Sequence, residues 1–207
     1  GGGRTDYGAL QYFTEFWASD NTDAFERVFI QWGYSYFFPS LAVCNHITSW
    51  GNESLKFRTD VAMMGKMGYD IRVADMSPEE LAFSHDAVAL YKKLSPVIWQ
   101  GDLYRVISPY KENRAVLMYV AKQKDKAVLF DYNLHTRYKE IFDRVPLQGL
   151  DATRNYRVQE VNLYPGTKSQ LPENGKVFSG TYLMTVGLNL SPKGSPLTSQ
   201  VIELTAQ

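Results

Sequence analysis

The chain has 207 residues, of which 44% are hydrophobic and 21% charged, a composition typical of an ordinary globular protein with one large or two small domains. Its 22 basic and 22 acidic residues cancel, and no apolar run approaches the roughly 20 residues needed to cross a bilayer, so neither nucleic acid nor a membrane is an expected partner. A single cysteine, Cys44, excludes an internal disulfide, and the three histidines lack metal-ligand spacing, so we expect no metal and no cofactor.

The first half of the chain begins with a strand followed by a helix. Residues 13–19 are rich in aromatic side chains and predict a strand. A helix is predicted over residues 22–36, because apolar residues recur at i, i+3, i+4 and i+7 from Phe25. Asp23 and Glu26 have the spacing of a capping box, which places the start of this helix.

Two further strand–helix units follow. The sequence predicts a short strand at Leu41–Cys44, a helix over residues 54–66 and a third strand in YDIRVAD, residues 69–75. The last helix begins at the capping signal S-P-E-E, which starts at Ser77, and we expect it to end near Leu94 because Ser-Pro follows.

The order β-α-β-α-β-α predicts parallel strands joined by helical crossovers. Three such units are too few to close a barrel, so one face of the predicted sheet is left open. We therefore expect the sequence to be part of a longer protein.

In the second half of the chain, apolar residues recur at every second position, a pattern typical of β-strands. The residues QKDK at 123–126 predict a hairpin turn. We expect two domains, residues 1–100 and 101–207, of which the second is an antiparallel β-sandwich. Its predicted strands are RAVLMYVAK, AVLFDYNL, NYRVQEVNLY, GTYLMTVGL and SQVIELTA.

The candidate site residues lie early in the chain, but each has a second interpretation. Asp20 follows a predicted parallel strand, at the edge where α/β barrels carry catalytic groups, yet an Asp before a helix is commonly a cap. Trp17 offers a flat face for a sugar ring, or it belongs to the core. The loop GGGR, from Gly1 to Arg4, lets a ligand approach the backbone closely, or it is a linker.

Four segments together resemble the C-terminal part of the α-galactosidases of glycoside hydrolase family 36. The resemblance is strong over residues 1–110 and looser in the β-rich remainder. Its most specific pattern is the run from Trp17 to Arg27. The segments are GGGRTDYGAL, WASDNTDAFERVFIQWG, FRTDVAMMGKMGYDI and YKKLSPVIWQGDLYRV.

This resemblance implies an α/β fold plus an all-β domain, namely units six to eight of a (β/α)₈ TIM barrel followed by an antiparallel β-sandwich. It implies that Asp20 is the general acid/base of a retaining glycosidase, that Trp17 lines the sugar pocket and that Gly1 contacts the galactose. Arg4 and Asp6 match the family pattern, and we assign them a structural role. His46 matches a position near the barrel rim and is a weaker candidate.

The catalytic nucleophile that the resemblance implies is absent. In the family it is an Asp in a K-x-D stretch at the end of strand four, whereas Gly1 aligns just after strand five. The stretch KQKDK at residues 122–126 lies in the wrong domain. We therefore expect the 207 residues alone to be inactive.

The leading hypothesis is the C-terminal portion of a retaining α-galactosidase that hydrolyses α-galactoside oligosaccharides of the melibiose and raffinose type. The resemblance also implies a homo-oligomer. A non-catalytic module for structure, assembly or sugar binding is the main alternative, and α-N-acetylgalactosaminidase specificity is another. One free cysteine favours the cytoplasm over the periplasm.

Overall fold

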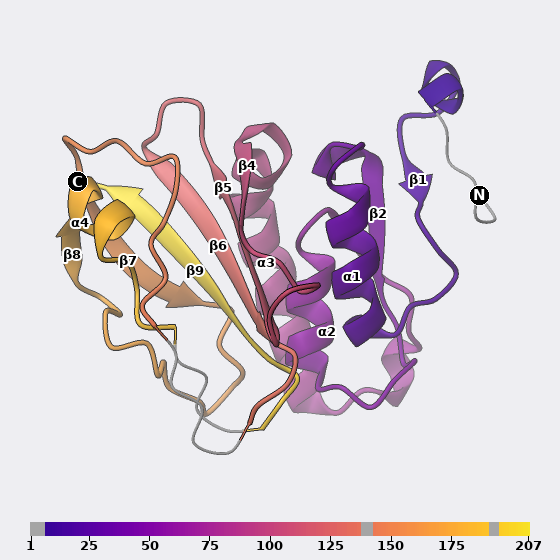
Figure 1. Ribbon diagram of the computed structural model, residues 1–207. Coiled ribbons are helices and arrows are strands. Elements are labelled where there is room, and N and C mark those ends of the chain that lie inside the picture. The colour runs from indigo at the N-terminus through magenta and orange to yellow at the C-terminus, as the bar shows by residue number, and fades with distance from the viewer. Residues whose placement is uncertain (1–6, 138–142, 191–194) are drawn as a thin grey trace. The chain divides into compact units, whose positions relative to one another are not determined.

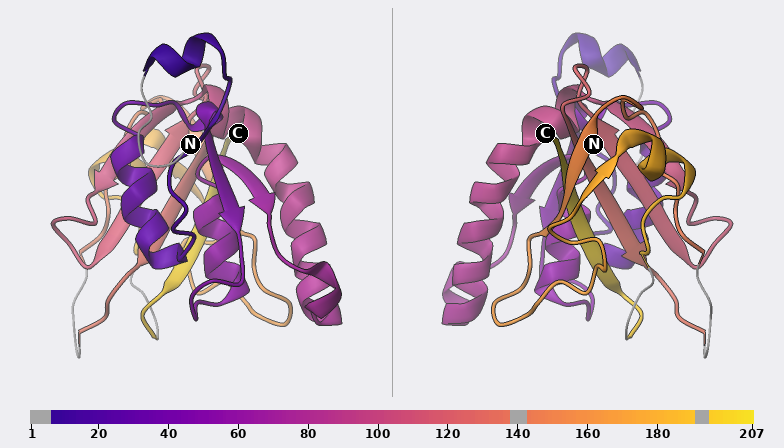
Figure 2. Two further views of the ribbon diagram at one scale, coloured as in Figure 1. Left: turned by 90° about the vertical axis from the view of Figure 1, so that its right-hand side faces the viewer. Right: turned by 90° about the vertical axis from the view of Figure 1, so that its left-hand side faces the viewer.

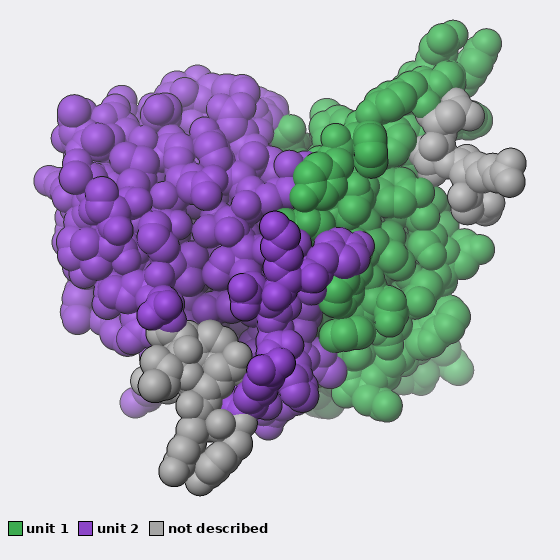
Figure 3. Space-filling model, viewed as in Figure 1, with its two compact units in different colours: residues 1–99 green, residues 100–207 purple. Residues whose placement is uncertain are grey.

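The computed structural model describes residues 7–137, 143–190 and 195–207. The chain forms two compact units, Gly1–Trp99 and Gln100–Gln207 (Figure 1, Figure 3). Gly1, Arg4 and Asp6 lie outside the described residues, so their expected roles stay predictions.

Three parallel strands form the sheet in the described part of the first unit (Figure 1). They are β1 (Phe16–Trp17), β2 (Val43–Ile47) and β3 (Lys66–Tyr69), in that spatial order. Both pairings are parallel, as the alternation of strands and helices predicts. The carboxyl ends of all these strands therefore meet at one edge of the sheet.

The helices of the first unit begin where capping chemistry predicts. In α1 (Ala24–Tyr34), the Asp23 side chain accepts a hydrogen bond from the Glu26 backbone N–H at 3.0 Å. In α2 (Leu55–Ala62), Ser54 is the corresponding cap. The third helix, α3 (Pro78–Gln100), starts with a complete capping box, in which Ser77 and Glu80 each accept a bond from the other's backbone N–H.

The strand predicted at residues 69–75 is wrong. The strand β3 ends at Tyr69, and Val73–Asp75 forms a short 3₁₀ turn. Its partner β2 ends at Ile47, which pairs with Tyr69, and Ile47 accepts one more bond from the Asp70 backbone N–H at 2.9 Å. Without a partner strand, the apolar residues that follow have no ladder to join.

The end predicted for the third helix is also wrong, because α3 continues through Pro96 to Gln100. Proline cannot donate to the carbonyl four residues earlier, which here belongs to Lys92. The Ser95 hydroxyl donates to that carbonyl instead, at 3.3 Å. Tyr91 of the same helix donates to the Gly65 carbonyl, which fixes α3 beside the β3 side of the sheet (Figure 2).

Antiparallel strands form one six-stranded sheet within residues 100–137, 143–190 and 195–207. The hairpin turn predicted at residues 123–126 is confirmed, with Lys124 in the left-handed region at φ 55°. The spatial order is β4 (Asp102–Ile107), β5 (Arg114–Val120), β6 (Lys126–Asn133), β9 (Thr198–Ala206), β7 (Asn155–Val161) and β8 (Val177–Ser179).

A second layer, made of loops and one short helix, covers one face of this sheet. Val145 and Leu188 form an isolated β-bridge in it, and both join the apolar core under the sheet. The strand predicted at residues 180–188 is wrong, since Gly180–Thr185 is the helix α4, capped by the Ser179 hydroxyl. The predicted fold class is confirmed: a parallel α/β part is followed by an antiparallel β-sheet unit.

The helices in the described ranges are all too short or too polar to span a membrane. The second unit contains a buried ion pair between Arg114 and Asp131. Arg114 holds Asp131 through two hydrogen bonds, of 3.2 and 2.7 Å, and also donates to the Leu190 carbonyl at 2.8 Å. This bidentate pair fixes β5, β6 and the segment before β9 to one another.

We predict that Asp131→Ala lowers the free energy of unfolding of the second unit by about 3–5 kcal/mol, because it leaves the Arg114 guanidinium buried without its counter-charge. Urea denaturation measures the change. Asp125→Ala, at an exposed position of the β5–β6 turn, is the matched control and should stay within about 0.5 kcal/mol. Equal loss in both variants would contradict a special role for the pair.

Candidate active site

A shallow hollow lies at the edge of the first unit's sheet where the parallel strands end. We call it the strand-end hollow. Its residues come from the end of β1 and from the segments that directly follow β1, β2 and β3, which is the edge where parallel α/β folds bind ligands. It is lined by Trp17, Asp20, Thr22, Thr48, Ser49, Trp50 and Asp70.

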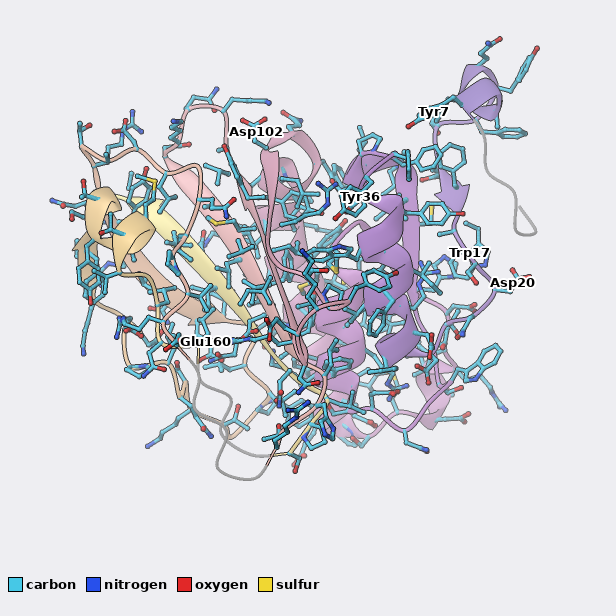
Figure 4. The ribbon with its side chains drawn as sticks, in the orientation of Figure 1. Tyr7, Trp17, Asp20, Tyr36, Asp102 and Glu160 are labelled. Carbon is cyan, nitrogen blue, oxygen red and sulfur yellow. The ribbon has the colours of Figure 1, made fainter. Side chains whose placement is uncertain are left out.

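Trp17 and Asp20, two of the three predicted site residues, are in direct contact. The Trp17 indole N–H donates a hydrogen bond to Asp20 Oδ1 at 3.0 Å. Figure 4 shows the two side chains next to each other just beyond β1. Gly1, the third predicted residue, lies outside the described residues.

The structure decides against Asp20 as a helix cap. A relay of short-range hydrogen bonds fills the turn instead: Ser19 Oγ accepts from the Asn21 N–H at 3.1 Å, and Asn21 Oδ1 accepts from the Asp23 N–H at 3.0 Å. Asp23 then caps α1. Asp20 is consequently free of the helix terminus, and its carboxylate is turned to the hollow.

Trp17 is half-buried and is not the core tryptophan of this unit, a role that belongs to Trp32 at 1% exposure. The His46 ring packs against the Trp17 indole with ring centroids 4.0 Å apart, and the Arg27 guanidinium lies 5.4 Å from the indole centroid. His46 therefore contacts the site through Trp17. Its Nδ1 lies 3.7 Å from Asp70 Oδ2.

A buried cation holds this turn in place. Arg27 of α1 donates to the Ser19 carbonyl at 3.3 Å, to the Cys44 carbonyl at 3.2 Å and to Asn45 Oδ1 at 2.9 Å. Burial lowers the pKa of Arg27 to about 10, so the guanidinium remains charged at neutral pH. The residue before Asp20 is thereby fixed to β2.

The segment after β2 is tied to the Asp20 turn by hydroxyl groups. Thr48 Oγ1 donates to Thr22 Oγ1 at 2.9 Å and accepts from the Trp50 backbone N–H at 3.2 Å. The Arg58 guanidinium donates to the Thr48 carbonyl. Sequence reasoning missed Thr22, Thr48, Trp50 and Asp70, because their proximity depends on strand pairing and not on spacing along the chain.

Comparison with known proteins identifies the family. A family model described as Melibiase matches residues 1–101, and one described as Glycosyl hydrolase family 36 C-terminal domain matches residues 114–204. The chain belongs to glycoside hydrolase family 36. The resemblance carried by the motif from Trp17 to Arg27 is thereby confirmed.

Relatives in this family are α-galactosidases. "Alpha-galactosidase 2" of Hypocrea jecorina is 33% identical over all of this chain, and "Alpha-galactosidase AgaA" of Geobacillus stearothermophilus is 33% identical over 80% of it. The crystal structure of the family 36 α-galactosidase AgaB from Geobacillus stearothermophilus superposes on the whole chain with a TM-score of 0.89 at 30% identity. The chain spans 27% of the Hypocrea protein and 28% of the AgaB chain.

A second polar cluster lies toward the starts of the same strands, where Glu15 precedes β1 and Lys66 is the first residue of β3. Lys66 Nζ lies 2.7 Å from Glu15 Oε2, and this bond lowers the pKa of Glu15. Burial raises the pKa of Cys44, which lies between them on β2. Within the described ranges, no group of three or more His, Cys, Asp or Glu residues is arranged to hold a metal ion.

We predict that Arg27→Lys destabilises the first unit by about 2–4 kcal/mol, because an ammonium group cannot reproduce the guanidinium fork and leaves buried carbonyls without donors. The midpoint of chemical denaturation measures this loss. Arg72→Lys is the control: its side chain is 84% exposed, and its loss should stay within about 0.5 kcal/mol. If Arg27→Lys is as mild as the control, the cation does not hold the turn.

Proposed function

We propose that this chain is the acid/base-bearing part of a retaining α-galactosidase that acts on terminal α-galactosides of the melibiose and raffinose type. The observation that carries the proposal is the Trp17–Asp20 hydrogen bond at the strand-end hollow. The names of the relatives support the substrate class, as does a solved structure of an AgaA variant in complex with raffinose, which is similar to this chain at a TM-score of 0.89.

Asp20 would protonate the departing glycosidic oxygen and then take a proton from the attacking water. The Trp17 N–H holds Oδ1, which leaves Oδ2 for proton transfer. A hydrogen bond to one oxygen also fixes the plane of the carboxylate, so the proton is presented in a defined direction. Trp17 would pack its exposed face on the galactose, and Gly1 would contribute the backbone of the neighbouring loop.

The second carboxyl group of a retaining site lies roughly 5–5.5 Å from the first. We propose that it comes from a part of the enzyme that these 207 residues do not include. Glu15 is engaged by Lys66, and Asp23 caps α1, so neither is available to attack the anomeric carbon. Asp70 lines the same hollow, so it is the carboxylate of this chain that has to be tested as a nucleophile.

In the enzyme that contains this chain, Asp20→Asn should lower kcat/KM for raffinose by about 10²- to 10⁴-fold, because the unactivated leaving group needs a proton. An aryl galactoside with an acidic leaving group should lose less in the first step. Azide should restore the second step, because it needs no general base. Steady-state kinetics with and without azide give the answer.

Asp23→Asn is the matched control for Asp20→Asn, because Asn caps a helix as well as Asp does. Its activity should stay within about threefold of the parent enzyme. Full activity of Asp20→Asn on raffinose would reject the acid/base assignment. Galactose binding without any hydrolysis in the parent enzyme would instead favour a sugar-binding module.

The 207-residue chain by itself should not hydrolyse a fluorogenic α-galactoside, because a single carboxylate cannot both attack the anomeric carbon and protonate the leaving oxygen. Turnover that follows the pure polypeptide and disappears in Asp20→Ala would show that the nucleophile is within the chain. Loss in Asp70→Asn as well would identify Asp70 as that nucleophile. The expected homo-oligomer likewise stays a proposal.

A further inference from the structure

Trp50 is an exposed tryptophan in the strand-end hollow. Its side chain is 59% exposed, whereas the core residue Trp32 is 1% exposed. It lines the strand-end hollow together with Asp20 but comes from a different loop, the one after β2. An indole that is more than half exposed beside the carboxylate proposed as the acid/base has apolar surface available to a ligand.

The backbone of the loop that carries Trp50 is constrained on both sides of the indole. On one side, the Trp50 backbone N–H binds Thr48, which is fixed by Thr22 and by Arg58. On the other side, Gly51 adopts φ +87°, a backbone conformation that residues with a side chain rarely adopt. A ligand that stacks on Trp50 would therefore not have to order the loop that carries it.

The groups around Trp50 suit a sugar. The Ser49 and Asp70 residues that line the hollow beside it offer a hydroxyl and a carboxylate, which can bind sugar hydroxyls, while the indole covers the C–H face of the ring. Asp20 must face the glycosidic oxygen, which lies between the galactose and the leaving group. Trp17, bonded to Asp20, is the residue proposed above to contact the galactose. Trp50 lines the hollow from the other loop, where the leaving-group sugar would lie.

We propose that Trp50 is the platform for the leaving-group sugar, so that it selects oligosaccharide substrates over galactosides with small leaving groups. This proposal rests on the function proposed above and names the part of the substrate that this indole binds. It predicts that Trp50 adds affinity for the sugar to be released and none for galactose itself.

The test compares substrates that share galactose and differ in the leaving group, in the enzyme that contains this chain. For Trp50→Ala, kcat/KM for raffinose and melibiose should fall about 3- to 10-fold, the scale of one lost aromatic contact. The value for α-galactosyl fluoride should not change, because its leaving group is one atom. Trp50→Phe should recover most of the raffinose activity, since it restores an aromatic face.

A binding measurement separates this proposal from the catalytic assignment. Calorimetry on Asp20→Asn, with and without Trp50→Ala, should show raffinose binding about 3- to 10-fold weaker when the indole is removed, and galactose binding unchanged. Tyr36→Ala, a change at a residue 60% exposed that does not line the hollow, is the control and should alter neither affinity.

Two results would overturn the platform. One is raffinose affinity and kcat/KM that do not change in Trp50→Ala. The other is an equal loss for raffinose, α-galactosyl fluoride and galactose, which would mean that Trp50 supports the galactose site or the fold. Full raffinose activity in Asp20→Asn would reject the acid/base role of Asp20. The role of Trp50 would still be decided separately, by the effect of Trp50→Ala on raffinose binding.

Discussion

The buried guanidinium of Arg27 is the contact on which the candidate site depends. It is a cation with no direct access to water, and it is satisfied by oxygens from the turn before Asp20 and from β2. A buried charge is tolerated only if its N–H donors are hydrogen-bonded, so the position of the guanidinium is strongly constrained. The same constraint fixes the Asp20 turn, since moving Ser19 would leave part of the charge unpaired.

Around this fixed point, the structure assigns different roles to three neighbouring carboxylates. The Asp23 carboxylate accepts a hydrogen bond from the backbone of α1, and the Glu15 carboxylate pairs with Lys66. The Asp20 carboxylate accepts a hydrogen bond from the Trp17 indole N–H at the surface. Their side chains differ little in chemistry, and their partners determine what each can do. A proton-transfer role requires a carboxylate that is oriented but not held in an ion pair, and among the described residues Asp20 has no ion-pair partner.

Features set by neighbours in sequence are predictable from the sequence. Caps at Asp23 and Ser77 follow from side chains that bond backbone groups three residues away, and the parallel order of the strands follows from the alternation of elements. The predicted strand at residues 69–75 fails because the length of β3 is set by where β2 ends. The Ser95 hydroxyl donates to the Lys92 carbonyl, the group that Pro96 cannot bond, and apolar periodicity does not predict this contact.

The site residues also divide into those that the sequence identifies and those that only the structure reveals. Trp17 and Asp20 are three residues apart in the motif that carries the family resemblance, and this resemblance, not the spacing alone, singles them out as a pair. Arg27 is hidden in the apolar pattern of α1, and Thr48, Trp50 and Asp70 reach the hollow only after the strands have paired. Sequence reasoning therefore finds the group proposed to do the chemistry more readily than the groups that position it.

Gly51 has a consequence for which positions of the loop after β2 can vary. Because its backbone is left-handed and a Cβ atom there would meet the Glu53 carboxylate, a larger residue at position 51 would strain the backbone and displace the Glu53 side chain. The residue at position 50 has no such restriction, because its side chain points to solvent. With the role proposed above for Trp50, exchange of this one side chain would change the preferred leaving group on a backbone that stays the same, so position 50 is a natural place to build libraries.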